Sequence, residues 1–233
     1  MKHIGIVAVS AEGAALCYRT ICLEGPAMLG PHDHPEITLH RFSLGSYQRL
    51  IDQDDWEAVG ELMLESAARL IRSGAQLVIC PDNTVHQGLD LVRLRSPVPW
   101  IHIAEEVADE ALRRGFKRLG ILGTRFLVEG PVYRSKLAPA GIDYRVPNEQ
   151  QRTRINQVIY DELVYARFLP QSRAYFQDVI RDLAGNGCDA VALACTEIPL
   201  LISPDDSPLP VLDSTRILAR AALREATSPE SQC

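Results

Sequence analysis

The chain has 233 residues, of which 46% are hydrophobic and 23% charged, and its formal net charge is −6. This composition is typical of a globular protein with one large domain or two small ones. The negative charge and the lack of a Lys/Arg cluster argue against nucleic-acid binding, and no apolar run approaches the roughly 20 residues that a membrane span needs.

The apolar run at residues 4–9 is only as long as a strand, and polar residues follow it at once, so we interpret it as a first β-strand rather than a signal peptide. Further strand-like runs alternate with amphipathic, helix-like stretches. This alternation predicts an α/β fold with parallel sheet covered by helices. The expected strands are 4–9, 77–80, 100–103, 119–122 and 190–194, and the expected helices include 56–72, 105–114 and 174–184.

An internal repeat divides the chain into two halves. The segment IGIV at residues 4–7 is echoed by LGIL at 119–122, and GAQLVI at 74–79 is echoed by GCDAVA at 187–192. Gly74 and Gly187 each follow a helical pattern and precede a strand, where glycine is favoured as a helix C-cap. Two homologous α/β halves are therefore expected.

Polar clusters open at matching places of the two repeats. Asp82-Asn83-Thr84 follows the strand of the first half, and Cys195-Thr196-Glu197 follows the equivalent strand of the second. Ligands of open α/β sheets bind beyond the carboxyl ends of the strands. If the halves face each other, Asp82 and Cys195 approach one ligand from opposite sides, a geometry that suits moving a proton from one face of a carbon to the other.

Each of these residues also has an ordinary structural interpretation. Most free cysteines are small buried hydrophobes, and aspartate is a common helix N-cap. The repeat and the flanking Thr196 and Glu197 favour a catalytic Cys195, whose thiolate a following helix N-terminus would stabilise. Asp82 is its expected partner. Asn83, Thr84 and Thr196 are expected to bind a substrate carboxylate. Ser10 and Thr124, after the first strand of each half, are expected to be further donors or to act only as caps.

Other chemistry has little support in the sequence. None of the six cysteines forms a CxxC pair, so we expect a reduced, cytoplasmic protein with free thiols. His32 and His34 lie in an expected loop without a third ligand in evident reach, so no metal site is predicted. A glycine-rich nucleotide-binding pattern is also missing. The cysteines are Cys17, Cys22, Cys80, Cys188, Cys195 and Cys233.

These motifs resemble the aspartate/glutamate racemase superfamily, most closely its amino-acid racemase branch, over nearly the whole chain. The segment ACTEIPLL at 194–201 resembles the second cysteine motif of that family, and VLDST at 211–215, ILGTR at 121–125, IYDEL at 159–163 and SAEGA at 10–14 resemble other family segments. The resemblance implies two pseudo-symmetric, Rossmann-like parallel-sheet domains with the active site in the cleft between them. The expected domains are 1–97 with 212–233, and 98–211.

The resemblance also implies a cofactor-independent enzyme, commonly a homodimer or higher homo-oligomer, that acts on a small carboxylate or amino acid through two opposed acid/base residues. The family's first cysteine motif would read Cys-Asn-Thr, whereas this chain has Asp82-Asn83-Thr84. A histidine common three residues after the Asp-Ser-Thr segment is Leu218 here. Glu197 is expected among the substrate-binding residues, and Arg49 and Arg167 are candidates for binding a distal carboxylate.

Three functions remain open from the sequence. The first is an amino-acid racemase that uses Asp82 and Cys195. The second is a decarboxylase, isomerase or lyase that needs only the thiol of Cys195. The third is a non-catalytic protein that binds a small acid.

Overall fold

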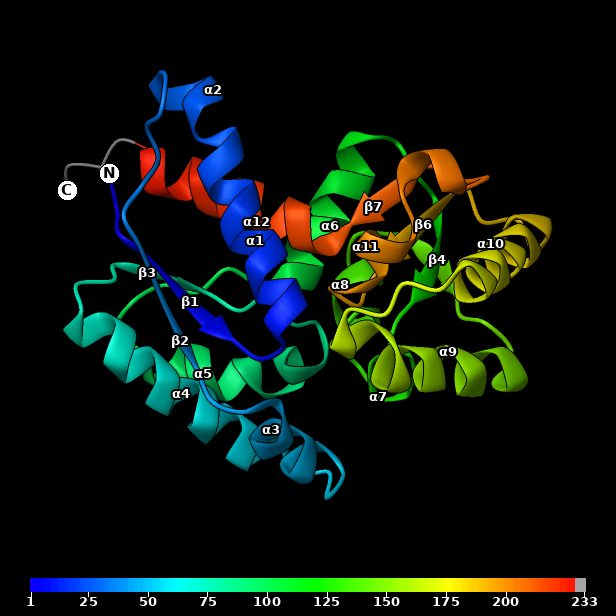
Figure 1. The fold of residues 1–233 in the computed structure, drawn as a ribbon, viewed down its shortest axis with the longest axis horizontal. Helices are drawn as coiled ribbons and strands as arrows, with labels where there is room; N and C mark the ends of the chain where they lie inside the picture. Colours follow the sequence, from blue (N-terminus) through cyan, green and yellow to red (C-terminus); the bar gives the residue numbers. More distant parts are fainter. Residues whose placement is uncertain (229–233) are drawn as a thin grey trace. The chain divides into compact units, whose positions relative to one another are not determined.

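The computed structural model describes residues 1–228, so Cys233 and the end of the expected first domain lie outside the described residues. The described chain contains two separate parallel β-sheets with helices packed against them, which confirms the expected α/β fold. By its contacts the chain divides into two compact units (Figure 1). The first comprises Met1–Ile103 with the described residues from Thr215 onward, and the second comprises Ala104–Ser214.

The first unit holds a three-stranded sheet in the order β2-β1-β3, with all pairings parallel. Helices α1 and α12 lie on one face of this sheet, and α4 and α5 lie on the other (Figure 1). Its elements are β1 (Ile4–Ala8), α1 (Ala11–Glu24), α2 (Pro26–Leu29), β2 (Ile37–Arg41), α3 (Leu44–Ile51), α4 (Trp56–Arg72), β3 (Leu77–Ile79), the 3-10 helix η1 (Thr84–Gly88), α5 (Leu89–Arg95) and α12 (Ser214–Thr227).

The second unit holds a four-stranded parallel sheet in the order β5-β4-β6-β7. Apolar side chains of α9 and α10 form its core with β4 and β6. Its elements are α6 (Ile103–Arg113), β4 (Arg118–Leu122), α7 (Arg125–Glu129), α8 (Arg134–Leu137), β5 (Asp143–Arg145), α9 (Glu149–Asp161), η2 (Leu163–Tyr165), α10 (Pro170–Gly185), β6 (Ala190–Leu193), α11 (Ile198–Leu201), η3 (Pro204–Asp206) and β7 (Val211–Asp213).

The sequence repeat is also a repeat of strand register. Ile4 of β1 pairs with Leu77 of β3, and Leu119 of β4 pairs with Ala190 of β6. Asp82 comes five positions after Leu77, and Cys195 comes five positions after Ala190. The two residues therefore follow equivalent strands at equivalent distances, at the carboxyl edges of their own sheets.

The helix before each of these strands packs closely on a glycine of the neighbouring strand. A Cβ atom added to Gly5 would lie 3.2 Å from the Cβ of Leu70 in α4, and one added to Gly120 would lie 2.8 Å from Cδ1 of Leu183 in α10. Gly74 and Gly187, which end the two helices, have positive φ angles of 100° and 82°. Both adopt the left-handed conformation expected of C-cap glycines.

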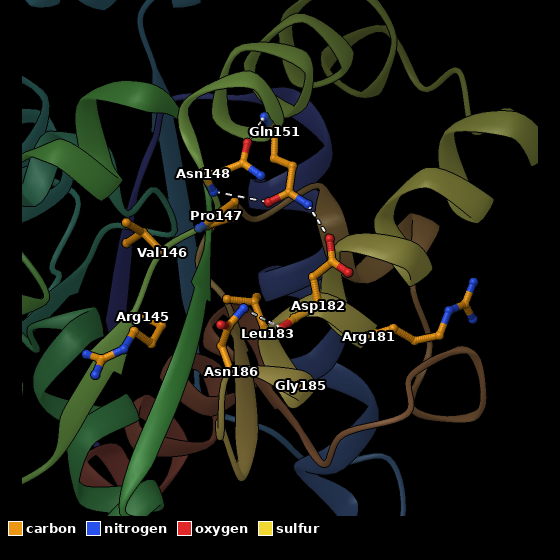
Figure 2. Close-up of a pocket in the computed structure, with 10 residues that line it drawn as sticks. All are labelled: Arg145, Val146, Pro147, Asn148, Gln151, Arg181, Asp182, Leu183, Gly185 and Asn186. Atoms are coloured by element: carbon orange, nitrogen blue, oxygen red, sulfur yellow. Dashed lines mark hydrogen bonds between the residues drawn. The ribbon is translucent and has the colours of Figure 1, made fainter.

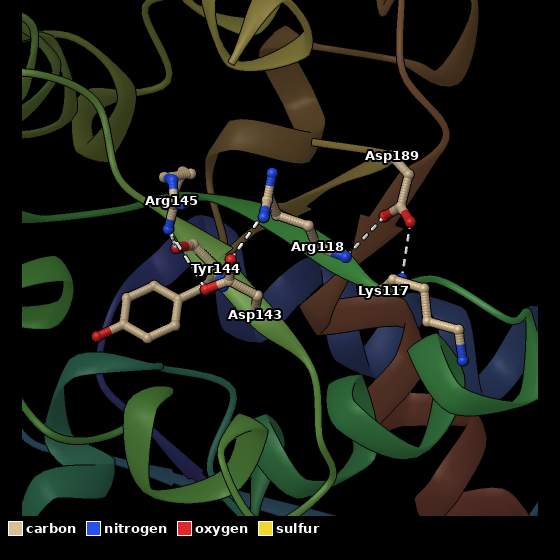
Figure 3. Close-up of polar contacts among 6 residues, drawn as sticks. All are labelled: Lys117, Arg118, Asp143, Tyr144, Arg145 and Asp189. Atoms are coloured by element: carbon tan, nitrogen blue, oxygen red, sulfur yellow. Dashed lines mark hydrogen bonds and ion pairs between the residues drawn. The ribbon is translucent and has the colours of Figure 1, made fainter. Parts of the chain in front are cut away.

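A matched pair of contacts fixes the start of these strands. In the second unit the Asp189 carboxylate accepts the backbone N–H groups of Lys117 and Arg118 at 2.7 and 3.1 Å (Figure 3). In the first unit the side-chain oxygen of Gln76 accepts the backbone N–H of His3 at 3.1 Å. Gln76 and Asp189 stand at equivalent positions, two residues after Gly74 and Gly187, so the repeat extends to side-chain roles.

One expected strand is wrong, and three short strands were not expected. Residues 100–103 form no strand, because only Trp100 bridges to Val78 of β3 and helix α6 begins at Ile103. The strands β2, β5 and β7 were missed. The chain passes from one unit to the other at 103/104 and 214/215, a few residues after the expected boundaries at 97/98 and 211/212. Trp100 still bridges to the first sheet, and β7 still pairs with β6 of the second.

Helix α12 returns the chain to the first unit. Its residues Leu218 and Leu223 lie in the core formed by β1, β3 and α1. Arg220 forms a bidentate ion pair with Glu24 of α1, with N–O distances of 2.7 and 2.8 Å. Leu218, where the family often has histidine, is fully buried and is a core residue here. Across residues 1–228 there is no helix with the length and apolar character to cross a membrane.

Candidate active site

The edge of the first sheet carries Asp82 on a short loop between β3 and η1. One carboxylate oxygen of Asp82 accepts the backbone N–H of Val85 at 3.2 Å, so the residue makes the cap-like contact considered from the sequence. Asp82 is partly exposed, whereas the neighbouring Asn83 and Thr84 are buried. The loop therefore presents the carboxylate more openly than the two residues expected to bind a substrate carboxylate.

His86 fixes this loop in one conformation. Its Nε2 lies 3.0 Å from the carbonyl oxygen of Cys80, and its Nδ1 accepts the backbone N–H of Ile103 at 3.3 Å. Because Nδ1 accepts while Nε2 faces an acceptor, the ring is the neutral Nε2–H tautomer. The buried ring also packs edge-on against His102, with centroids 4.7 Å apart. His86 thus joins both ends of the loop to the start of α6.

Tyr47 is a polar residue of this region that the sequence did not reveal. It lies on α3, which follows β2 at the carboxyl edge of the sheet, and it is fully buried. Its hydroxyl has no hydrogen-bond partner among residues 1–228. Burial, followed by the electrostatic influence of the nearby Cys80 and Asp82 side chains, raises the pKa of Tyr47. A tyrosine on an amphipathic helix resembles an ordinary core residue, so no sequence signal marked it.

Cys80 belongs to the core rather than to this edge. Its side chain is fully buried, and burial, reinforced by the nearby Asp82 charge, raises the pKa of its thiol well above the ordinary range. A thiol of this kind is neither a good nucleophile nor a good base at neutral pH. Cys80 is therefore a core residue and not a candidate acid/base group.

The edge of the second sheet carries Cys195 and Glu197 side by side. The Cys195 thiol donates to Oε2 of Glu197 at a distance of 3.0 Å, and the Thr196 hydroxyl donates to the same oxygen at 3.3 Å. All three side chains are buried, with Cys195 6% and Glu197 3% exposed. Thr196 and Glu197, both expected to bind substrate, are therefore engaged with each other and, through Glu197, with Cys195.

The helix after Cys195 is too short to stabilise a thiolate through its dipole, contrary to the expectation from the sequence. Glu197 is the N-cap of α11, which has only four residues, and Cys195 precedes this cap by two positions. Because a helix dipole grows with the number of aligned peptide units, one turn contributes little. The immediate electrostatic neighbour of the thiol is the Glu197 carboxylate, which disfavours a thiolate.

Ser10 and Thr124 are N-caps in the structure. The Ser10 hydroxyl oxygen accepts the backbone N–H of Gly13, and the Thr124 hydroxyl oxygen accepts that of Leu127, each at 3.3 Å. The cap interpretation is therefore confirmed for both. The cap at Ser10 uses an oxygen lone pair, so the Ser10 hydroxyl proton can still be donated.

The basic candidates are surface residues. Arg49 on α3 and Arg167 after η2 are both exposed, and the Arg167 guanidinium lies over the Tyr165 ring. Arg41, which the sequence did not mark, ends β2 and donates from Nε to the carbonyl oxygen of Val9 at 3.2 Å. Arg41 therefore lies next to the connection between β1 and α1, which contains Val9 and Ser10.

The segment after β7 supports the end of β6. The Ser214 hydroxyl donates to the carbonyl oxygen of Leu193 at 2.8 Å, two residues before Cys195. Tyr133 is bonded to the Ser214 side chain, and burial raises the pKa of this tyrosine. Val211–Asp213 and Ser214 therefore hold the strand that positions Cys195.

A surface cavity of about 490 Å³ lies elsewhere on the second unit (Figure 2). Its wall is formed by the loop between β5 and α9 and by the last turns of α10, and none of the expected site residues lines it. Gln151 bridges its two sides by donating to Asp182 at 2.6 Å. The described residues also contain no cluster of three or more side chains able to hold a metal ion.

A comparison with known protein families identifies the family to which this chain belongs. The model of the Asp/Glu/hydantoin racemase family matches residues 6–222, which span both units and both sheet edges. The chain belongs to this family. The resemblance seen in the sequence is thereby confirmed, as is the expectation of an enzyme of the racemase type.

Characterised relatives of this racemase-family chain are distant in sequence. The broad specificity amino-acid racemase RacX of Bacillus subtilis is 22% identical over 192 residues, covering 82% of each chain. The glutamate racemase of Thermus thermophilus is 28% identical over 172 residues, covering 69% of this chain and 59% of its own.

Solved structures share the fold over nearly the full length. A candidate Asp/Glu racemase from Yersinia pestis is 31% identical, has a TM-score of 0.88, and is matched over 98% of this chain and 100% of its own. An aspartate racemase homologue from Pyrococcus horikoshii is 26% identical with a TM-score of 0.84, again over 98% and 100%. The expected arrangement of two parallel-sheet domains is confirmed by these similarities.

Proposed function

We propose that this chain is a cofactor-independent amino-acid racemase in which Asp82 and Cys195 act on opposite faces of the substrate Cα. One removes the Cα proton and the other delivers a proton to the opposite face, which inverts the configuration. Both residues would have to reach one substrate, so the proposal requires the two sheet edges to face a common space.

The observation that carries this proposal is the equivalence of the two positions. Asp82 and Cys195 each come five residues after paired strand positions of matching register, at edges where α/β proteins bind ligands. Each residue can carry and release a proton. Family membership supports the same reaction type, and the name of RacX supports an amino acid as substrate.

The two groups are not equal acids. Unperturbed Asp titrates near pH 3.9 and Cys near 8.5, so a resting carboxylate and a resting thiol are expected. This form removes a proton with Asp82 and delivers one from Cys195. The opposite direction needs the reverse protonation state, which costs about 6 kcal/mol from the reference values alone. The equilibrium constant of a racemisation is unity, so kcat/KM is the same in both directions. We therefore propose that the two directions differ in kcat, measured at saturating substrate, with a matching difference in KM.

The chemistry of Asp82 also limits the substrate. A carboxylate close to the ligand repels further anionic groups, so a substrate with fewer negative charges than aspartate is favoured. The proposed contacts for the substrate carboxylates are the hydroxyl groups of Ser10 and Thr124, the polar groups of Asn83 and Thr84, and the cations Arg41, Arg49 and Arg167.

Incubation in D2O with a panel of single amino acids tests the function. Deuterium incorporation at Cα together with loss of optical rotation is expected for at least one substrate. Asp82→Asn and Cys195→Ala should each reduce the rate about 100-fold or more, because each removes one acid/base group. The asparagine can still accept the Val85 N–H, so the loop is retained and circular dichroism should be unchanged.

Other products would identify the alternative functions. Release of CO2 or formation of an olefin, without racemisation, would indicate a decarboxylase or lyase. Thermal stabilisation by amino acids without turnover, in wild type and Cys195→Ala alike, would indicate a binding protein.

A further inference from the structure

Glu197 is a buried acidic side chain that the proposed two-base reaction does not use. Its Oε2 accepts from the Cys195 thiol at 3.0 Å and from the Thr196 hydroxyl at 3.3 Å. Its Oε1 is buried and has no hydrogen-bond partner among residues 1–228. Both donors therefore converge on one oxygen, and that oxygen is the acceptor of the thiol proton.

Among the described residues, no Lys or Arg side chain is recorded as an ion-pair partner of this carboxylate. Within residues 1–228, the side-chain partners of Glu197 are a thiol and a hydroxyl, both neutral donors. A buried carboxylate is costly unless hydrogen-bond donors replace the lost water. The Cys195 thiol is one of the two side-chain donors to Glu197 recorded among the described residues. Loss of the thiol proton would therefore remove half of this hydrogen bonding from the carboxylate.

Loss of that proton would be unfavourable for two reasons. The carboxylate would lose a donor, and a thiolate would then stand 3.0 Å from it in a region of low solvent exposure. Like charges at this distance repel strongly where water does not screen them. Every contact of the Glu197 side chain therefore favours the neutral thiol.

We propose that Glu197 is a positioning residue that keeps Cys195 protonated, so that Cys195 serves as the proton donor of the pair. In place of the substrate contact expected from the sequence, Glu197 acts through the sulfur. The Cα–H bond breaks as its proton passes to Asp82, and a new Cα–H bond forms with the proton of the Cys195 thiol. Afterwards Asp82 releases its proton to solvent and the Cys195 sulfur takes one back, which restores the starting form.

This assignment has a consequence for direction, which rests on the proposed racemase function. Asp82 as base and Cys195 as acid convert one enantiomer, and Glu197 would make this the direction with the higher kcat. The amide of Glu197→Gln keeps the size and an oxygen acceptor but removes the charge. At saturating substrate it should raise the reverse kcat relative to the forward kcat, while kcat/KM stays equal in the two directions.

The pH dependence of Cys195 alkylation by iodoacetamide tests the proposal without any turnover. The extent of reaction is followed by mass spectrometry of the peptide that contains Cys195, with Cys195→Ser as the blank. In wild type the midpoint should lie above about 8.5, the value for an ordinary cysteine. In Glu197→Gln the midpoint should move to lower pH, and alkylation at pH 7 should be at least three-fold faster than in wild type.

Thr196→Val is the matched control. It removes the other donor to the same oxygen but leaves the charge, so the midpoint should stay at or above that of wild type. A wild-type midpoint at or below the ordinary value, or a midpoint in Glu197→Gln equal to or above that of wild type, would overturn the proposal. If no amino acid is racemised but these midpoints hold, the proposed function fails and the role of Glu197 stands.

Discussion

Asp82 and Cys195 occupy equivalent positions in the two halves, yet their surroundings differ in charge and exposure. Asp82 is partly exposed and accepts a backbone N–H group, which favours a carboxylate. Cys195 is buried beside the Glu197 carboxylate, which favours a thiol. The two matched positions therefore have different hydrogen-bond roles, since Asp82 accepts a hydrogen bond from the Val85 N–H and Cys195 donates one to Glu197.

Asp82→Cys should reduce the difference between the forward and reverse kcat. The substitution replaces an unlike pair by two thiols of the same chemical type, so the two protonation states become closer in free energy. Initial rates of racemisation measured from each pure enantiomer at saturating concentration give the comparison. Asymmetry as large as in wild type would count against Asp82 as one of the two acid/base groups.

Cys80→Ala should leave racemisation within about three-fold of wild type. The thiol is fully buried, and burial together with the Asp82 charge raises its pKa, so it remains protonated and unreactive at neutral pH. Native protein at pH 7 should also show no alkylation of the peptide containing Cys80. A loss of activity like that of Cys195→Ala, in a variant with wild-type circular dichroism, would contradict this assignment.

The sequence identified the two sheet-edge residues but not their partners. Asp82 and Cys195 could be found because the repeat aligns them along the chain. The direction of the Glu197 side chain could not, since a residue two positions from a cysteine can point toward it or away from it. Tyr47 and Arg41 reach the first sheet edge from α3 and β2, which carry no repeat signal.

At the scale of single elements, glycine determines how closely a helix approaches its strand. Leu70 of α4 lies against Gly5, and Leu183 of α10 lies against Gly120. Both leucines come four residues before the C-cap glycine that leads into the next strand. The same packing solution therefore occurs in each half.

Gly120→Ala should destabilise the protein by about 1–3 kcal/mol, because the new methyl group would overlap Leu183. Urea unfolding followed by circular dichroism gives the change in free energy. In a Leu183→Ala background the same substitution should cost less, since the overlapping side chain has been shortened. Equal costs in both backgrounds would show that this contact does not limit the helix position.

Strands were predictable where both faces are buried. The strands β1, β3 and β6 are fully buried apolar runs, and β4 is one after its first residue, Arg118, as expected for parallel sheet. The edge strand β2 reads Ile-Thr-Leu-His-Arg, and β5 has three residues of which two are charged. Their polar composition reflects partial exposure, so neither has an apolar pattern that distinguishes a strand from a loop.

At the scale of the whole chain, the second unit is an insertion within the first. Residues 104–214, between α5 and α12 in the sequence, form the second unit. Helix α12 then adds apolar side chains to the core of the first unit: Leu218, Ala219, Ala222, Leu223 and Ala226. The N–O contacts between Arg220 and Glu24 add to this attachment. The first unit thus depends on residues from both sides of the insertion.

Leu223→Ala should reduce stability mainly in the first unit, by about 2–4 kcal/mol, because it leaves a cavity in that core. Hydrogen exchange measured by mass spectrometry should show faster exchange in β1 and β3 than in wild type, with β4 and β6 less affected. Phe176→Ala, in the core of the second unit, should give the opposite pattern. Equal loss of protection in both units for both variants would mean that they unfold as one cooperative body.

The late position of α12 has a consequence for synthesis on the ribosome. All core residues of the second unit precede α12, so that unit can fold while the last helix is still being translated. The strands β1, β2 and β3 are synthesised earlier, but part of the apolar surface of their sheet stays uncovered until α12 leaves the ribosome. The nascent chain is therefore expected to expose β1 and β3 to chaperones for longer than β4 and β6.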